Sequence, residues 1–282
     1  MIMSAHARRH IMTAALVLPA MLFLILCFVA PLLALFKLSV TAEQGWQWAY
    51  GQILGSSVYL RVFWNTLVIA FVVTVLSVIL AYPTAYLLTL LKGWKLALAI
   101  YGVLFPLWIS VLIRTFAWIL LLEKNGPVNR LLVGSGLTES PIQFLFNNTG
   151  VLIGMVHVLL PYAILPIFAN MLRIDGRLLL ASDGLAASPW MTFRRIYLPL
   201  SMPGISAGAV FVFLLSLGFF ITPALLGGIN NLTVAMLIEL LVNERLIWSQ
   251  AAAASVLLLA AVGAFLAVTT RFVRLGAVLE AR

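Results

Sequence analysis

The chain has 282 residues, of which 64% are hydrophobic and only 9% charged, and its mean hydropathy is +1.15. Soluble domains carry roughly a quarter charged residues, so this composition excludes an ordinary soluble protein and predicts an all-α integral membrane protein. The formal net charge of +9 does not indicate a nucleic-acid partner, because the basic residues sort by side of the membrane.

Six segments are long and apolar enough to cross a bilayer, for which about 20 residues suffice. They are predicted near residues 12–36, 62–91, 95–122, 151–171, 205–226 and 251–270. The first segment follows a basic start and is too long for a signal-peptide core, so we expect it to be retained. Pro83 is expected to kink the second segment. The single cysteine, Cys27, excludes an internal disulfide.

The basic residues predict the orientation, since they concentrate on the cytoplasmic side. With the N-terminus in the cytoplasm, 11 basic and three acidic residues lie inside, five of each lie outside, and Arg114 falls within the third span. Both termini are therefore predicted to be cytoplasmic, in a single transmembrane domain covering residues 1–282. Residues 173–202, between the fourth and fifth spans, form the largest charged cytoplasmic loop.

This 173–202 loop is predicted to form two short helices with a bend between them. Asp175 is a candidate N-cap of a first helix that runs to about Ala186. Ser188 followed by Pro189 has the form of an N-cap and first helical position. The second helix is expected to stop before Pro199, because the residue before a proline is pushed out of the helical region. A compact charged element of this kind suits a soluble partner better than lipid.

Catalytic and metal-binding signals are missing from the sequence. There is no G-x-x-x-x-G-K-[ST] loop to cradle phosphates, so the chain is not expected to bind ATP itself. The three histidines, at positions 6, 10 and 157, form no metal-ligand pair within a span, and no nucleophile–base arrangement stands out. We therefore predict a protein that is not an enzyme and that binds no metal or cofactor.

The loop resembles that of permease subunits of binding-protein-dependent ABC importers, whose pattern runs E-A-A-x-x-x-G and, about nine residues later, I-x-L-P. The second half is intact here as Ile196-Tyr197-Leu198-Pro199. The first half is degraded, because Leu180 stands where the family has glutamate and Ala186 where it has glycine. The usual glutamate contact with the ATPase is therefore in question, and Asp183 is a candidate substitute.

Three further segments resemble the spermidine/putrescine-type branch of this family, and the resemblance covers about residues 10 to 275. They are the start of the second span, the third span with its following loop, and the end of the fifth span: Asn65-Thr66-Leu67; Pro106-Leu107-Trp108, Ile113–Trp118 and Asn125–Asn129; and Phe220–Gly228.

The resemblance implies a type I ABC importer permease fold with six transmembrane helices in the cell inner membrane. It implies a translocation path for a small polar solute, polyamine-like first, with amino-acid derivatives or phosphonates next. The implied partners are ATP-binding cassette subunits that hold ATP and Mg, a second and different permease subunit, an external solute-binding protein and membrane lipid. Nucleic acid is not among them.

The residues expected to couple the loop to the ATPase lie on both sides of its bend. They are Asp183, Ala186, Ala187, Ser188, Pro189, Trp190, Phe193, Arg194, Arg195, Leu198 and Pro199. The alternative is a positive linker that only orients the protein, but orientation does not require Ser-Pro-Trp or Leu-Pro. Trp190 and Phe193 share a helix face. They either enter the partner's groove or pack back on the spans.

The candidates for the translocation path are the polar and aromatic residues of the spans, together with one proline. They are Asn65, Trp108, Arg114, Trp118, His157 and Pro223, with Tyr162 as a further candidate. Ionisable residues within spans are functional candidates by default, although Arg114 can also snorkel or cap carbonyls. Most of the others equally suit helix packing. A cation in the path would repel a polyamine and would suit a carboxylate- or phosphonate-bearing solute better.

Two other classes of function remain as alternatives. An ion-coupled secondary transporter would show repeated halves and broken spans with acidic ion sites, and no Asp or Glu lies clearly within a span here. A structural membrane-assembly subunit would not need the helix-bend-helix loop.

Overall fold

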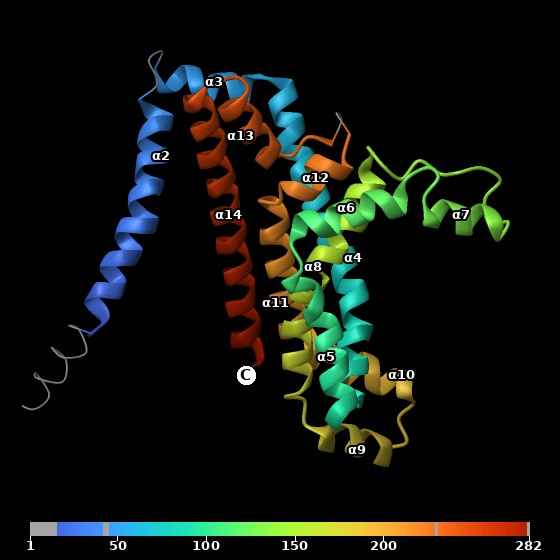
Figure 1. Cartoon of the computed structure of the whole chain (residues 1–282). Coiled ribbons are helices and arrows are strands. Elements are labelled where there is room, and N and C mark those ends of the chain that lie inside the picture. The colour runs from blue at the N-terminus through green and yellow to red at the C-terminus, as the bar shows by residue number, and fades with distance from the viewer. Residues whose placement is uncertain (1–15, 42–44, 229–230, 281–282) are drawn as a thin grey trace, which may run out of the picture. The chain divides into compact units, whose positions relative to one another are not determined.

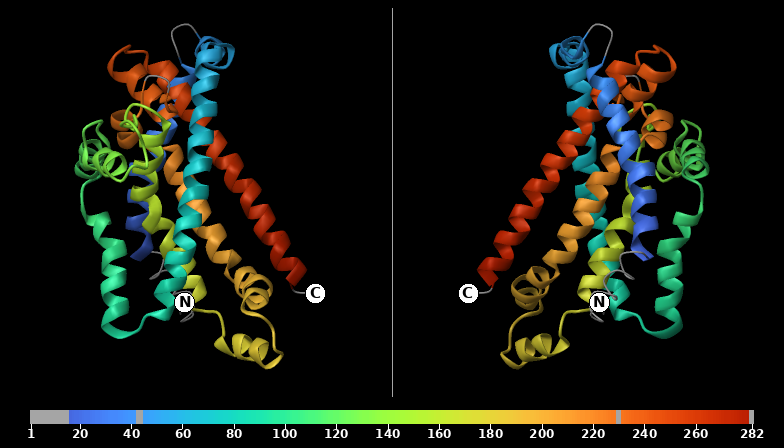
Figure 2. Two further views of the ribbon diagram at one scale, coloured as in Figure 1. Left: turned by 90° about the vertical axis from the view of Figure 1, so that its right-hand side faces the viewer. Right: turned by 90° about the vertical axis from the view of Figure 1, so that its left-hand side faces the viewer.

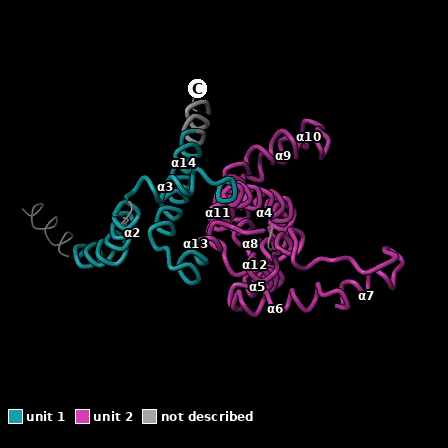
Figure 3. Tube along the Cα trace, turned by 90° about the horizontal axis from the view of Figure 1, so that it is seen from above, with its two compact units in different colours: residues 1–60, 238–282 teal, residues 61–237 magenta. Residues whose placement is uncertain are grey.

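A computed structural model describes residues 16–41, 45–228 and 231–280. Within these ranges all regular structure is helical (Figure 1). The elements are η1 (Ile25–Val29), α2 (Ala30–Val40), α3 (Trp46–Gly55), α4 (Ser57–Leu90), α5 (Gly93–Trp108), α6 (Val111–Leu122), α7 (Pro127–Gly134), α8 (Asn148–Met171), α9 (Gly176–Gly184), α10 (Pro189–Thr192), η2 (Phe193–Tyr197), α11 (Leu198–Leu217), α12 (Ile221–Leu226), α13 (Val234–Asn243) and α14 (Trp248–Glu280). The chain forms two compact units, residues 1–60 with 238–282 and residues 61–237 (Figure 3).

Five described helices are long and apolar enough to cross a membrane: Leu16–Val40, Ser57–Leu90, Asn148–Met171, Pro189–Leu217 and Trp248–Arg271. A sixth span is formed by a helix pair, Gly93–Trp108 and Val111–Gly134, which is bent by 97°. The described helices therefore provide the six predicted spans when this pair is counted as one. The start of the first predicted span, residues 12–15, lies outside the described residues.

The third predicted span, 95–122, consists of two helices, α5 and α6, with a break between them. Ile109 and Ser110 have ψ angles of 134° and 136°, which separate α5 from α6. Pro106 lies in the last turn of α5, where its ring removes one helical hydrogen bond. The chain therefore turns sharply at this point, and α6 begins as a new half-helix.

The fifth predicted span, 205–226, includes two helices, α11 and α12, and the predicted stop before Pro199 is wrong. The helix begins at Pro189 and runs through Pro199 to Leu217, and α12 follows as a separate short helix. Just before Pro199 the helix widens into the π-helical turn η2, in which the Leu198 amide donates to the Phe193 carbonyl. This wider turn makes room for the proline ring, which would clash with an ordinary α-helical turn.

The first unit consists of η1, α2, α3, the start of α4, the end of α13 and α14. Helix α14 packs against both α2 and α3. The Ser39 and Tyr50 hydroxyls lie 2.9 Å apart and join α2 to α3. Close to the start of α14 lies a run of four small residues, Ala251–Ala254, which are all buried.

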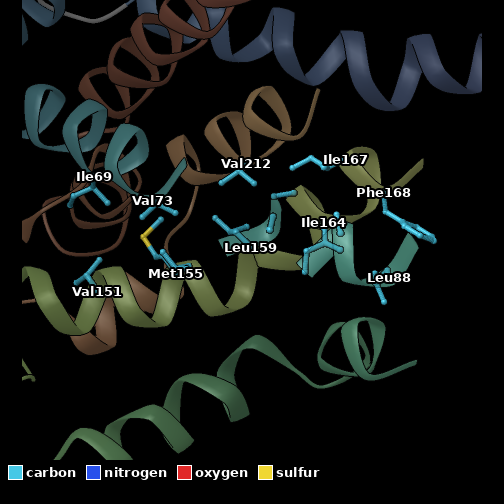
Figure 4. Close-up of a cluster of buried hydrophobic side chains, with 14 of the residues drawn as sticks. Ile69, Val73, Leu88, Val151, Met155, Leu159, Ile164, Ile167, Phe168 and Val212 are labelled. Atoms are coloured by element: carbon cyan, nitrogen blue, oxygen red, sulfur yellow. The ribbon is translucent and has the colours of Figure 1, made fainter. Parts of the chain in front are cut away.

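The second unit is built around α8, whose buried face contributes more residues to the hydrophobic core than any other helix (Figure 4). Helix α11 runs along α8 (Figure 2). Their close approach depends on Gly204, where an added Cβ would lie 2.6 Å from the Asn170 Cβ. Helix α4 contributes Ile69 and Val73 to the same core, as Figure 4 shows. Pro83 lies inside α4, which continues past it to Leu90.

Candidate functional site

The helices of the 173–202 loop begin at the predicted caps. The Asp175 Oδ1 accepts a hydrogen bond of 2.9 Å from the Arg177 amide at the start of α9. The Ser188 Oγ accepts one of 3.3 Å from the Met191 amide at the start of α10. These bonds satisfy amides that a helix leaves unpaired at its first turn. Both predicted N-caps are confirmed, and α9 ends at Gly184.

The bend between the two helices turns at Ala186, whose φ angle is +53°. This left-handed conformation favours glycine, and Ala186 occupies the position where the sequence pattern has glycine. The backbone there is hydrogen-bonded, because the Ala186 amide donates to Asp183 O (2.9 Å) and the Ala187 amide to Ser182 O (3.2 Å). The hydroxyls of buried Ser182 and of Thr192 lie 2.6 Å apart, which joins α9 to α10. The bend is therefore a defined turn rather than a loose linker.

Large apolar side chains are exposed on this loop. Leu180, at the position of the expected glutamate, is 71% exposed, and Trp190 is 67% exposed. Between α9 and the α10–η2 segment lies an open, mostly apolar groove of about 340 Å³. It is lined by Leu178, Ala181, Ser182, Leu185, Ala187, Met191, Thr192, Arg195 and Ile196. The loop thus offers an apolar surface to a partner, with Asp183, Arg194 and Arg195 as exposed charges beside it.

Aromatic rings connect this loop to α4. Trp190 stacks on Phe193 with ring centroids 5.6 Å apart, and Phe193 meets Tyr82 of α4 edge-on at 6.0 Å. A second edge-on pair joins Tyr197 to Tyr86 at 5.4 Å. Phe193 therefore packs back on the spans, which is one of the two predicted alternatives, whereas Trp190 is exposed. We call Trp190, Phe193 and Tyr82 the aromatic relay.

Tyr82 and Tyr86 were not among the predicted site residues. The signal that identifies them is their spacing, because residues four apart on a helix share a face. The hydroxyl of Tyr82, the α4 member of the aromatic relay, also lies 3.1 Å from the Ser201 hydroxyl of α11. Two of the remaining predicted loop residues lie where the loop helix enters the span: Leu198 is half-buried and Pro199 is exposed.

Three of the predicted path residues come together between α6 and α8. The Trp118 indole N–H donates to His157 Nδ1 at 3.2 Å, with the two rings edge-on at 5.4 Å. Arg114, one turn before Trp118, is buried and lies within electrostatic reach of His157 and Tyr162. Helix α12 packs against the same half-helix, because the Thr115 and Thr222 hydroxyls lie 3.2 Å apart.

The other predicted path residues are not part of this cluster. The Asn65 side-chain amide donates to Leu232 O at 2.9 Å, so Asn65 holds the segment before α13. Trp108 is exposed at the end of α5. Pro223 is buried next to Thr222, and its carbonyl accepts the Gly227 amide, which closes a turn at the end of α12.

Comparison with known sequences identifies relatives that are transport permeases. A search with models of protein families finds no match. The chain is 34% identical over 217 residues to the spermidine/putrescine transport system permease protein PotB of Escherichia coli (strain K12), covering 77% of this chain and 79% of that protein. It is 33% identical over 226 residues to PotB of Salmonella typhimurium (strain LT2), covering 80% and 78%. The inner membrane ABC transporter permease protein YdcU of E. coli is 38% identical over 175 residues, which covers 58% and 56%.

Among solved structures, a chain of a bacterial alginate ABC transporter, in complex with an alginate pentasaccharide-bound periplasmic protein, has the same fold. Its TM-score is 0.79 at 18% identity, and the match covers 95% of both chains. Together with the sequence relatives, the fold defines a multi-pass membrane transport permease, which is a class of protein without enzymatic activity. The chain belongs to the family of ABC transporter permease proteins, in its spermidine/putrescine-type branch.

Proposed function

We propose that this chain is the inner-membrane permease subunit of an ATP-driven importer that carries a small, polyamine-like solute. The named solutes of PotB and the inner-membrane description of YdcU support this assignment. In this proposal the 173–202 loop faces the cytoplasm and contacts separate ATPase subunits, which bind ATP and Mg. A second, different permease subunit completes the path, and an external binding protein delivers the solute, as a periplasmic protein accompanies the alginate transporter.

The observation that carries the proposal is the aromatic relay from the exposed Trp190 through Phe193 to Tyr82 of α4. A push on the loop can reach the spans only if the loop is stiff and in contact with them. The caps at Asp175 and Ser188, together with the Ser182–Thr192 bond, stiffen the loop. The aromatic relay supplies the contact between the loop and the spans. The π-helical turn η2 joins α10 to α11 without a break, so the loop helix and the span form one continuous helix.

The surface offered to the ATPase is apolar at its centre. Leu180 and Trp190 would be desolvated on docking, which favours binding in proportion to the apolar area removed from water. Asp183 lies three residues after Leu180 and is exposed, so it remains the candidate for the acidic contact. We infer a partner groove with an apolar floor and a cationic edge.

Copurification of the ATPase subunit tests this proposal. Trp190→Ala removes the exposed end of the relay and is expected to reduce both ATPase recovery and solute-stimulated hydrolysis. Trp94→Ala is the matched control, because Trp94 is also strongly exposed, at 72%, but lies at the start of α5 outside the loop. Equal effects of the two variants would contradict a docking role for the loop.

A second variant tests coupling rather than docking. Ala187→Glu places a charge in the half-buried floor of the groove and is expected to uncouple ATP hydrolysis from transport. Normal transport by this variant would remove the coupling assignment. Solute transport by the purified chain alone, without any ATPase, would instead favour the ion-coupled carrier.

A further inference from the structure

The segment between α6 and α8 extends sideways from the second unit (Figure 1). We call its residues 125–143 the lateral arm, which consists of α7 and the segment that returns toward α8. Seen from above, α7 lies clear of the other helices of this unit (Figure 3). Leu131 and Leu137 of the lateral arm are 73% and 75% exposed. A projecting element with large exposed apolar side chains is typical of a contact surface.

The rotation of α7 within the lateral arm is fixed by Asn129, which is only 1% exposed. Its side-chain amide donates to Ile142 O at 2.9 Å and to Glu123 O at 3.2 Å. Its Oδ1 accepts the Ile142 amide at 2.8 Å. Because a buried polar side chain is costly to leave unpaired, these three bonds hold the Asn129 face of α7 against the returning segment. The opposite face of α7 is therefore held outward.

The outward face of α7 is apolar. Each residue of an α-helix is rotated by about 100° from the one before it, so Leu131, two residues after Asn129, lies on the opposite side. Pro127 and Gly134, four and three residues from Leu131, share its face, and all three are exposed. In Figure 1 the returning segment lies on the side of α7 that is away from α9. The face with Leu131 is therefore turned in the direction of α9, back toward the level of the spans.

The level of α7 along the spans follows from the break in the third span. Helix α5 has 16 residues and is about 24 Å long, which is short of the roughly 30 Å hydrocarbon core of a bilayer. There the chain turns by 97° into α6, so it runs across the spans near the edge of the hydrocarbon core. Helix α7 packs against α6 and lies at its level in Figure 1. The outward face of α7 thus lies where lipid head groups meet acyl chains.

We propose that the lateral arm rests on the outer leaflet of the membrane, with Pro127, Leu131 and Gly134 in contact with lipid. Arg130 borders this face and is exposed, so its stem can lie along the acyl chains while its guanidinium reaches the lipid phosphates. A protein that binds from outside would instead meet the returning segment, with Glu139, on the other side of α7. The lipid contact holds α6, the outer half of the broken span, at a fixed depth. This inference goes beyond the proposed function, which enters only in naming the leaflet.

Site-directed spin labelling tests this placement in the assembled importer, in vesicles of phosphatidylethanolamine and phosphatidylglycerol. Cys27 is the single cysteine of the chain, so Cys27→Ala with cysteine-free partner subunits gives a background without other labels. A nitroxide at Leu131→Cys should collide more with lipid-soluble oxygen than with a water-soluble nickel chelate, and it should lie about 5–10 Å below the phosphates. Gly134→Cys should give the same result, since an added Cβ there meets open space.

Two control labels bracket this result. Leu98→Cys is the lipid control, because Leu98 of α5 is 63% exposed, and its label should be accessible to oxygen and hardly to nickel. Glu139→Cys, on the returning segment, is the matched aqueous control and should show the reverse. Copurification of the ATPase checks that each variant is assembled. If Leu131→Cys fails to assemble, Gly134→Cys decides.

Three outcomes would overturn the inference. The first is nickel accessibility at Leu131→Cys and Gly134→Cys equal to that at Glu139→Cys, which would place this face in water. The second is protection from both reagents only after the binding protein is added, which would assign the face to that protein. The third is protection from both reagents without it, which would assign the face to the second permease. None of these outcomes affects the proposed importer function, which failure of wild type to retain its ATPase would refute instead.

Discussion

The left-handed backbone at Ala186 gives a quantitative test of how the loop is built. A φ angle of +53° costs an alanine roughly 1–2 kcal/mol relative to its preferred conformation, whereas glycine adopts it freely. Ala186→Gly also increases the freedom of the open chain, which offsets about 0.4–1 kcal/mol. The net effect is a stabilisation of about 0.5–1 kcal/mol, or a two- to fivefold shift in the local opening equilibrium.

Hydrogen–deuterium exchange of the loop amides measures this shift directly. The amides of Leu185 and Ala187, which donate to carbonyls of α9, should exchange roughly two- to fivefold more slowly in Ala186→Gly. Ala187→Gly is the control, because Ala187 is not among the residues with a positive φ angle and glycine there only adds freedom. Its loop amides should exchange faster. Faster exchange in Ala186→Gly would refute the view that the alanine is strained.

Two further substitutions test the packing that holds the site. Ser182→Ala removes the 2.6 Å hydrogen bond to Thr192 and is expected to reduce the local stability of the loop by about 0.5–1.5 kcal/mol. Protease cleavage of the loop should become faster, while the melting temperature of the spans should not change. Gly154→Ala would place a methyl group 2.5 Å from a Leu226 methyl and should cost about 1–3 kcal/mol, measured as a lower Tm in detergent. Gly102→Ala, which meets open space, should leave Tm unchanged or higher.

Features of the loop that depend on neighbours in sequence were predictable. Asp175 and Ser188 cap their helices because a short polar side chain reaches amides only two or three residues away. The intact Ile196–Pro199 motif led to the permease family, which the PotB relatives confirm. Hydropathy located the spans because crossing a bilayer requires a long apolar stretch, whatever the stretch packs against.

Features that depend on backbone geometry were not predictable in this way. Pro199 signalled a helix end, but the wider π-turn before it keeps the helix continuous. Hydropathy did not reveal the break at Ile109 and Ser110, because an apolar segment reads the same whether it is straight or bent. The Trp118–His157 bond joins residues 39 positions apart, which no local pattern can pair.

The sequence by itself determined that this is a membrane permease with a stiff, capped loop, since composition, caps and motif are local properties of the chain. Tertiary structure alone decided how that loop contacts the spans, because the contact between Phe193 and Tyr82 requires α4 and the loop helix to be packed together. It also decided that Arg114 is buried without a counter-ion among the described residues. Burial and pairing depend on which residues surround a side chain, and only the folded chain brings those residues together.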